Sequence, residues 1–332
     1  MGIKIGIPRG LLYYRYVPLW QTFFQELGCE VVFSTPTTEQ MVNQGASIAV
    51  SDLCLPIKAY FGHILSLRDR VDLLFVPRYI SIEEDAYMCP KFLGLPDMVA
   101  NTMQPLPPLI DYPINYKGGK KMTEPRFYEK VGKSFSRDSR RVRQAYQKGL
   151  ERQGNFRYLQ QKGLSFEEAL DLSMSSSKGP GTTREVNTAQ PTIGLVGRPY
   201  YLNDPFLNKG IAEKVMTRGY TIMTTESLTE TEVNRQISKL SKRVYWSFGK
   251  EMVGSALHFA GDSEVRGIIN LASFGCGQDS FNSEIVSYHV KRMGTTPLLS
   301  LIFDEHWSDG GLITRLEAFL DVISRRNRKE KG

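Results

Sequence analysis

The sequence predicts an α/β protein in which two parallel-sheet domains are joined by a helical stretch. Short β-branched runs alternate with helical periods near the N-terminus, and this rhythm is typical of a parallel sheet covered by helices. The same rhythm returns after a middle stretch of different composition. At 332 residues the chain is long enough for two ordinary domains whose cores need no disulfide bonds.

The first domain is expected to cover residues 1–115. Its apolar runs predict strands, and the spacing of apolar residues between these runs predicts helices, the second of them amphipathic. We expect the strands at 3–7, 30–33 and 73–76, and the helices at 19–27 and 55–67.

The second domain, expected over residues 191–324, begins like the first. Residues 193–198 (IGLVGR) correspond to residues 5–9 (IGIPR), and each segment leads through aromatic residues into a helix, a glycine turn and a second strand. We infer two similar domains that face each other, although convergence on a common βαβ pattern would give the same signal. A long helical stretch over 241–259 and a strand over 298–303 continue this domain.

The stretch between the domains is polar and basic. Residues 116–172 are rich in Lys, Arg, Gln and Glu with apolar residues at helical spacing, which predicts a helical insertion. Residues 137–157 within it form either a docking face or merely a solvated helix face. Residues 173–190 predict a flexible linker. The net charge of +7 is concentrated in this insertion and in the basic tail 325–332, and without a recognition motif we do not expect nucleic acid as a partner.

Three of the four cysteines lie far apart in turns that contain Gly or Pro. Cys89 and Cys276 follow predicted strands, so we expect both at the sheet edge where the carboxyl ends of parallel strands meet and ligands bind. Cys54 precedes a predicted helix, whose positive end would lower the pKa of the thiol. Cys29 stands in a helix-to-strand turn, on the opposite edge, and is predicted to be structural.

Thiolates gathered by a fold are a common way to hold a metal in a reducing compartment. Three of them, Cys54, Cys89 and Cys276, suit a [4Fe-4S] cluster with one open iron. Structural zinc normally takes four ligands, often with a Cys-x-x-Cys pair, and this pair does not occur in the sequence. The histidines, including His63 on the helix after Cys54, are expected to be surface or core residues. The alternative is that all three cysteines are buried small apolar residues.

Charged residues recur at the ends of predicted strands. Arg9, Arg78 and Arg198 each follow a strand, where they would bind phosphate or stabilise an anionic cluster, or else form ion pairs at domain edges. Glu305 and His306 follow the last strand and are candidates for a general acid or base, with a cap-and-turn role before the final helix as the alternative.

Several classes of protein are not expected. The sequence has neither a Gly-x-x-x-x-Gly-Lys-Ser/Thr loop nor a Gly-x-Gly-x-x-Gly after a strand, so nucleotide energy would come from another protein. The N-terminus lacks the charged and apolar regions of a signal peptide, and the apolar runs fall short of the roughly 20 residues that span a membrane. We therefore expect a cytoplasmic protein with free thiols or thiolate ligands.

Several motifs together resemble the acyl-CoA dehydratase activase-related proteins, a group related to the iron-sulfur subunits of 2-hydroxyacyl-CoA dehydratase and benzoyl-CoA reductase. The resemblance covers both α/β domains in order, while the basic middle stretch and the tail contribute little to it. The motifs that carry it are Gly6-Ile7-Pro8-Arg9 with Tyr13-Tyr14, 54–58 (CLPIK) through Gly62-His63, 89–97 (CPKFLGLPD), Gly197-Arg198-Pro199-Tyr200, 274–280 (FGCGQDS), and Asp304-Glu305-His306 with 314–319 (TRLEAF).

The resemblance implies two flavodoxin-like domains facing a cleft, where Cys54, Cys89 and Cys276 would hold a [4Fe-4S] cluster. It also implies a partner, a separate ATP-dependent activase of actin-like fold that injects one low-potential electron into the cluster. The protein that receives the electron then dehydrates or reduces an acyl-CoA thioester. Phosphate loops of an activase are not recognised in this sequence, so we expect the electron-accepting side or an accessory of it.

Three functions follow as hypotheses. The first is an iron-sulfur redox protein that serves acyl-CoA dehydration, reduction or a related difficult reduction. The second is a non-catalytic docking or assembly module for an activase or a dehydratase complex. The third is a CoA-binding protein that uses Arg9, Arg78 or Arg198 on the phosphates.

Overall fold

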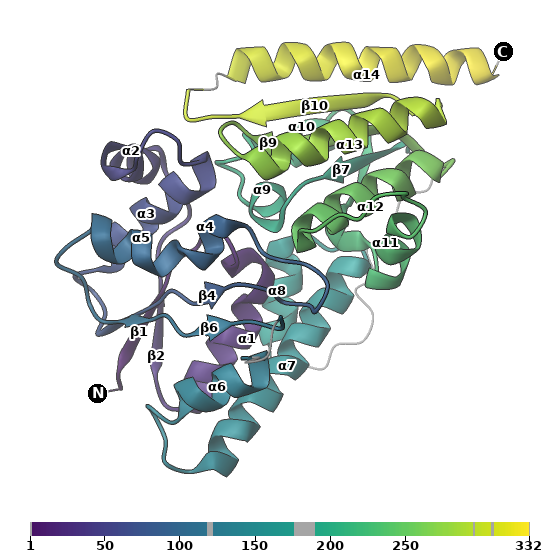
Figure 1. The fold of residues 1–332 in the computed structure, drawn as a ribbon. Coiled ribbons are helices and arrows are strands. Elements are labelled where there is room, and N and C mark those ends of the chain that lie inside the picture. Colours follow the sequence, from purple (N-terminus) through teal and green to yellow (C-terminus); the bar gives the residue numbers. More distant parts are fainter. Residues whose placement is uncertain (1, 118–121, 176–189, 295, 307–308, 332) are drawn as a thin grey trace. The chain divides into compact units, whose positions relative to one another are not determined.

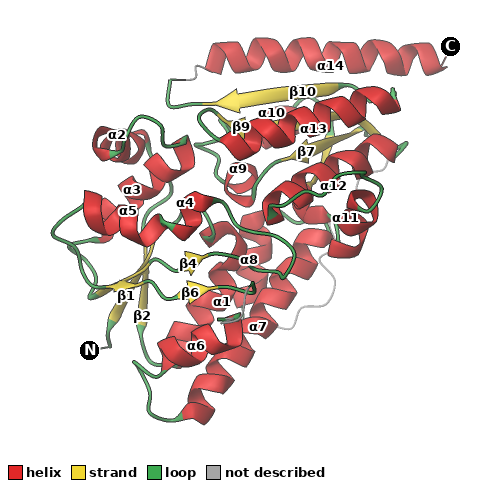
Figure 2. Ribbon diagram, viewed as in Figure 1, coloured by secondary structure: helices red, strands yellow, loops and turns green. Residues whose placement is uncertain are grey.

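Two four-stranded parallel sheets, each flanked by helices, form the framework of the chain (Figure 1). Figure 2 shows the strands in yellow and the helices that cover them in red. The α/β class with parallel sheets that the sequence predicts is therefore confirmed. The computed structural model describes residues 2–117, 122–175, 190–294, 296–306 and 309–331.

The chain crosses three times between two compact units. Unit 1 comprises residues 1–183 and 244–247, and unit 2 comprises residues 184–243 and 248–332. Of the predicted linker, residues 176–189 lie outside the described residues. Among the helices of the described part, none combines the length and the apolar character needed to cross a membrane.

The sheet of unit 1 has the strand order β2-β1-β3-β5, and all its neighbouring strands are parallel. Its central strand β1 is buried from Ile5 to Ile7, as expected for a strand covered on both faces. A short parallel pair, β4 with β6, follows β3 and β5 along the chain. The strands are β1 (Lys4–Ile7), β2 (Glu30–Phe33), β3 (Leu73–Phe75), β4 (Arg78–Tyr79), β5 (Leu109–Ile110) and β6 (Pro113–Ile114).

The helices of unit 1 depart from the sequence prediction at α1 and α2. Helix α1 begins at Tyr13 rather than at residue 19 and continues through Pro18, because burial of Tyr13, Tyr14 and Val17 stabilises its first turns. Helix α2 was not predicted from the sequence. The helices are α1 (Tyr13–Glu26), α2 (Glu39–Ile48), α3 (Leu55–Leu67), α4 (Pro90–Leu93), α5 (Leu95–Thr102), α6 (Glu124–Gly132), α7 (Ser139–Gln161) and α8 (Phe166–Met174).

Helix α3 is buried along nearly its whole length, which corrects the prediction of an amphipathic helix. Its polar residues Lys58 and His63 are as buried as its apolar ones. Helix α2 packs against α3 at Gly45 and Gly62, two positions where a Cβ would collide with the backbone of the other helix. Because two small residues let the helix backbones approach closely, α2 covers the face of α3 that the sequence pattern assigns to solvent.

The basic middle stretch forms helices that belong to unit 1. Helix α7 packs on α1, where the Arg141 guanidinium donates to the carbonyl oxygen of Glu26 at 3.0 Å and the Lys148 ammonium contacts the Glu26 carboxylate at 2.8 Å. The predicted helical spacing is confirmed, since its apolar positions face inward. Those that are buried include Phe127, Val131, Val142 and Tyr146.

The sheet of unit 2 has the order β10-β9-β7-β8 and is parallel throughout. The two sheets therefore share one strand order. When the strands of each sheet are counted along the chain, the order across the sheet is second, first, third, last. The strands are β7 (Thr192–Val196), β8 (Thr221–Thr224), β9 (Val265–Ser273) and β10 (Leu298–Phe303). The helical elements are α9 (Pro199–Asn203), α10 (Ile211–Met216), the 3₁₀ turn η1 (Thr225–Ser227), α11 (Glu230–Ile237), α12 (Ser247–Gly261), α13 (Gly277–Met293) and α14 (Asp309–Lys331).

Helix α12 begins later than predicted because the residues before it belong to unit 1. The Tyr87 N–H donates to the carbonyl oxygen of Tyr245 at 2.8 Å, and the Ser247 N–H donates to the carbonyl oxygen of Tyr87 at 3.1 Å. These two bonds hold residues 244–247 as an extended strap beside Tyr87, which pairs with Trp246 as an isolated parallel bridge. The predicted helix over 241–259 is therefore wrong before residue 247.

Candidate functional site

Each of the three predicted ligand cysteines is the residue immediately before a helix. Cys54 precedes α3, Cys89 precedes α4 and Cys276 precedes α13. Cys54 and Cys276 are buried and Cys89 is half-buried. Helices α3 and α13 are long, so Cys54 and Cys276 lie at the positive end of a helix dipole, whereas α4, after Cys89, has only four residues.

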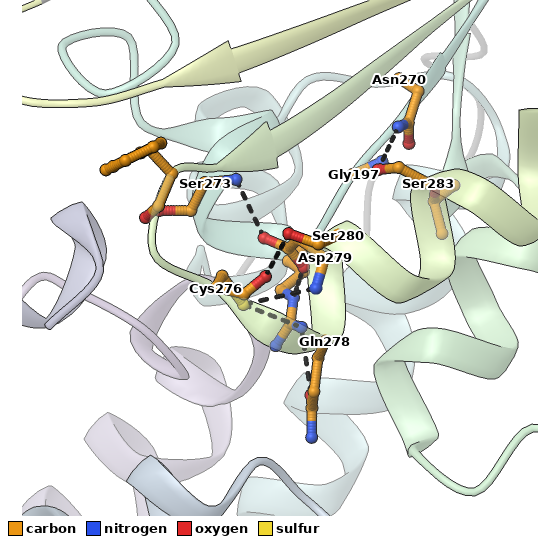
Figure 3. Close-up of polar contacts among 11 residues, drawn as sticks. Gly197, Asn270, Ser273, Cys276, Gln278, Asp279, Ser280 and Ser283 are labelled. Carbon is orange, nitrogen blue, oxygen red and sulfur yellow. Dashed lines mark hydrogen bonds and ion pairs between the residues drawn. The ribbon is translucent and has the colours of Figure 1, made fainter. Parts of the chain in front are cut away.

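The Cys276 sulfur lies against a backbone N–H of α13 and against the Arg198 guanidinium (Figure 3). Its Sγ accepts a hydrogen bond from the Asp279 N–H at 3.4 Å, and Arg198 Nη2 approaches the same sulfur at 3.7 Å. Figure 3 shows Cys276, Gln278 and Asp279 together at the start of α13. The sulfur therefore receives donors from the backbone and from a cation at once.

The strand order explains why Arg198 and Cys276 meet. Arg198 follows β7 and Cys276 follows β9, and these strands are parallel neighbours at the centre of the sheet. The chain leaves β7 toward β8 on one side, while β9 lies on the other side, so the two residues flank a topological switch point. Ligands of open α/β sheets bind in the crevice at such a point.

In unit 1, one lysine ties the two cysteine loops together. Lys91 lies two residues after Cys89, and its Nζ donates to the carbonyl oxygen of Asp52, two residues before Cys54, at 3.2 Å. A backbone hydrogen bond also holds the Cys89 loop, because the Met88 N–H donates to the carbonyl oxygen of Ile80 at 2.9 Å. Cys54 and Cys89, which are far apart in the sequence, therefore belong to neighbouring loops.

The three predicted anion-binding arginines all form ion pairs. Arg9 contacts Glu167 at 3.3 Å, and Arg198 Nε donates to Asp279 Oδ1 at 2.7 Å. The Arg78 guanidinium donates to both carboxylate oxygens of Asp97, at 2.6 and 2.8 Å. Its guanidinium also donates to the carbonyl oxygen of Leu93 at 2.8 Å, so Arg78 fastens α4 and α5 to β4.

Cys29 lies in the turn between α1 and β2, at the amino end of the strand. Burial raises the pKa of its thiol to about 11, and the nearby Arg141 offsets only part of that rise. This thiol stays protonated at neutral pH, which is unsuited to a metal ligand.

The sequence also matches a known family. Residues 4–228, more than half of the chain, match the CoA enzyme activase uncharacterised domain. The chain belongs to this family. The matched residues include Cys54, Cys89 and Arg198, whereas Cys276 lies beyond the matched range. A comparison with curated proteins gave no match.

In this CoA enzyme activase domain protein, the predicted ligands divide between the units. Cys54 and Cys89 belong to unit 1 and Cys276 belongs to unit 2. Within the described ranges, no three or more His, Cys, Asp or Glu side chains are grouped to hold a metal ion. The set of three cysteines therefore stays a prediction.

The acidic and imidazole candidates after β10 lie in a local turn. The His306 N–H donates to Asp304 Oδ1 at 2.9 Å, an arrangement typical of an Asx turn, and the His306 side chain is exposed. Helix α14 begins shortly afterwards, at Asp309. This geometry favours the cap-and-turn interpretation of Glu305 and His306.

His63 is a core residue, one of the two roles expected for it, but its hydrogen-bond partners were not predicted. It is buried, with Nδ1 2.9 Å from Ser34 Oγ and Nε2 3.0 Å from Thr37 Oγ1. Ser34 Oγ also accepts from the Arg9 N–H at 2.8 Å, so this network pins the turn after β1. For Asp279 a signal existed, because an acidic residue three positions after a helix-capping residue is a known helix-start pattern.

Proposed function

We propose that this chain is a cytoplasmic iron-sulfur redox protein. It would accept low-potential electrons from a separate ATP-dependent activase of actin-like fold and serve the dehydration or reduction of acyl-CoA thioesters, or a related difficult reduction. The family match supports a role in a CoA enzyme activation system. The sequence resembles the acyl-CoA dehydratase activase-related proteins, and the relationship of that group to iron-sulfur subunits of 2-hydroxyacyl-CoA dehydratase and benzoyl-CoA reductase supports the electron-accepting role.

The observation that carries the proposal is the environment of the Cys276 sulfur. A sulfur that accepts a hydrogen bond from a backbone N–H and faces a guanidinium lies in surroundings that suit a metal-ligating cysteine. Cys54 at the start of α3 and Cys89 in the adjoining loop supply the same donor chemistry. These three residues would hold a [4Fe-4S] cluster, which supplies one-electron chemistry at low potential.

The chain's own contribution would be to fix the ligand loops. The Lys91 contact to Asp52 sets the Cys54 loop beside the Cys89 loop, and the strap at 244–247 holds Tyr87, two residues before Cys89. Ordered ligands need less rearrangement when a metal binds, so this arrangement favours binding of a cluster.

Anaerobic purification with iron and sulfide analysis tests the proposal. We expect a brown protein with about four irons per chain, and loss of iron in each of Cys54→Ala, Cys89→Ala and Cys276→Ala. Cys29→Ala is the matched control and should keep its iron, since that thiol stays protonated. An iron-free wild-type protein that cannot be reconstituted, or cysteine variants with unchanged iron, would refute the proposal.

A docking or assembly module is the second candidate. It is favoured by α7, where Arg137, just before the helix, and Arg140 and Arg143 within it, are exposed and offer a basic surface to an acidic partner. Single-turnover mixing with an activase and ATP separates the two functions. An electron taken up and passed to an acyl-CoA thioester supports the redox function, whereas tight binding without electron transfer supports the docking function.

A further inference from the structure

Arg198 and Asp279 form an almost completely buried ion pair at the switch point of unit 2. Their side chains are 2% and 1% exposed, and the Arg198 Nε to Asp279 Oδ1 distance is 2.7 Å. Removing two charges from water is costly, and a well-packed apolar pair is often at least as stable. A buried pair beside a cysteine is therefore better explained by what it does for the cysteine than by stability.

The hydrogen bonds fix the direction of the guanidinium. Asp279 Oδ1 accepts from Arg198 Nε, and Asp279 Oδ2 accepts from the Ser273 N–H at 3.0 Å, which anchors the carboxylate to the end of β9. With its Nε side held, the guanidinium presents Nη2 to Cys276 Sγ at 3.7 Å and to Gln278 Oε1 at 3.1 Å. The planar guanidinium of Arg198 thus connects the Asp279 carboxylate, the Gln278 amide and the Cys276 sulfur.

We propose that Arg198, held by Asp279, is a positioning residue for the Cys276 sulfur, which it keeps oriented and electrostatically stabilised as a metal ligand. This inference rests on the proposed function and goes further by separating Arg198 from the other two candidate arginines. Arg9 and Arg78 bind carboxylates, and Arg78 also donates to a backbone carbonyl oxygen, whereas Arg198 also faces the Cys276 sulfur.

The role depends on the fork geometry of arginine. A lysine ammonium is a compact point charge that cannot bond to Asp279 and present a second fixed donor to Cys276 in the same planar arrangement. Hydrogen bonds and positive charge near ligand sulfurs favour the reduced, more negative state of an iron-sulfur cluster. Weakening the contact should therefore make reduction harder.

The test compares Arg198→Lys with Arg218→Lys after anaerobic reconstitution. Arg218 is the matched control because it forms an ion pair with Glu317 at 3.0 Å, in the same unit but on residues that do not contact Cys276. The measured quantities are iron content, the rate of iron loss to a chelator, and the reduction potential from a dye-mediated titration. We expect Arg198→Lys to lose iron faster and to have a more negative potential, and Arg218→Lys to match the wild type.

The outcomes separate the proposed function from the role of Arg198. A wild-type protein that takes up no cluster refutes the proposed function and this inference with it. If the wild type takes up a cluster and Arg198→Lys has the same reduction potential and the same rate of iron loss, the inference is refuted and the proposed function is not.

Gln278→Glu keeps the inference testable if Arg198→Lys does not fold. A carboxylate at residue 278 would draw Arg198 Nη2 away from the sulfur and add negative charge beside it. We expect a more negative potential in this variant, and an unchanged potential would overturn the inference.

Discussion

Gly62 of α3 faces the carbonyl oxygen of Met41 in α2 with no room for a side chain between them. The two helices cross here at backbone contact, and Gly45 of α2 meets the carbonyl oxygen of Lys58 in the same way. This crossing sets the path of α3, whose first residue follows Cys54 directly. A packing contact on one side of the helix therefore determines where a candidate ligand lies at its end.

Replacing Gly62 with alanine should destabilise unit 1. The new Cβ would collide with backbone that cannot rotate away, and overpacking of this kind costs about 1–3 kcal/mol. Gly154→Ala is the control, because Gly154 is exposed on α7 with open space around it and alanine is the better helix former by about 1 kcal/mol. Urea unfolding should show a lower midpoint for the first variant and an equal or higher one for the second. Equal midpoints in both would contradict the close crossing.

Strands were predicted well from the sequence where a local apolar run was sufficient to mark them. Short apolar runs predicted β2 and β10 to the residue, although both are edge strands that are only partly buried. Helix α2 was not predicted, although Thr38 caps it and the acidic Glu39 lies in its first turn, two helix-start signals that the sequence carries. The start of α12 was misplaced because residues 244–247 pair with Tyr87, a contact between distant parts of the sequence that periodicity does not report.

The sequence named Cys54, Cys89, Cys276 and Arg198 as candidates, and their role as ligands and anion contacts stays a prediction; the hydrogen bonds that hold these residues were not predicted. Topology alone places Arg198 and Cys276 at the ends of neighbouring strands, and the structure brings them into contact. The Lys91 bond to Asp52 has no sequence signature, because any lysine near any carbonyl could form it. Which arginine faces a sulfur depends on side-chain directions that a motif does not encode.

Cys29 should react slowly with alkylating agents at neutral pH. Burial raises its pKa to about 11, so the thiol is protonated well above pH 8 and only the thiolate is a nucleophile. Timed alkylation with iodoacetamide, followed by peptide mass spectrometry, should show the rate at Cys29 increasing with pH up to about pH 11. The rate in urea is the control, since unfolding removes the burial. A native rate at pH 8 equal to the rate in urea would contradict the buried environment.

His63 should make the protein less stable as the pH falls. Burial, with a smaller effect of the Arg9 charge, lowers the pKa of His63 from 6.5 to about 4. Between these values the unfolded chain binds a proton that the native protein does not, so stability decreases from pH 6.5 toward pH 4, by about 3 kcal/mol in all. His63→Gln, whose amide can still bond to Ser34 and Thr37, should remove this contribution. Urea unfolding at pH 7 and pH 5 measures it, and the same pH dependence in the variant would disprove the assignment.

Glu124 should make the protein less stable as the pH rises, over nearly the same pH range. Burial raises its pKa from 4.5 to about 7, with Arg15 offsetting part of the rise. The native protein therefore keeps a proton that the unfolded chain releases, and this stabilisation is complete below pH 4.5 and lost as the pH rises toward 7.

The two contributions oppose each other between about pH 4.5 and 6.5, so the wild-type stability should change little there. Each single variant should expose the slope of the other group. In His63→Gln the free energy of unfolding should decrease as the pH rises, because only Glu124 remains, and in Glu124→Gln it should increase. The double variant is the control and should be nearly flat. If Glu124→Gln keeps the wild-type profile, Glu124 titrates in the native protein as it does in the unfolded chain, and its burial beside the tyrosines of α6 and α7 has no electrostatic consequence.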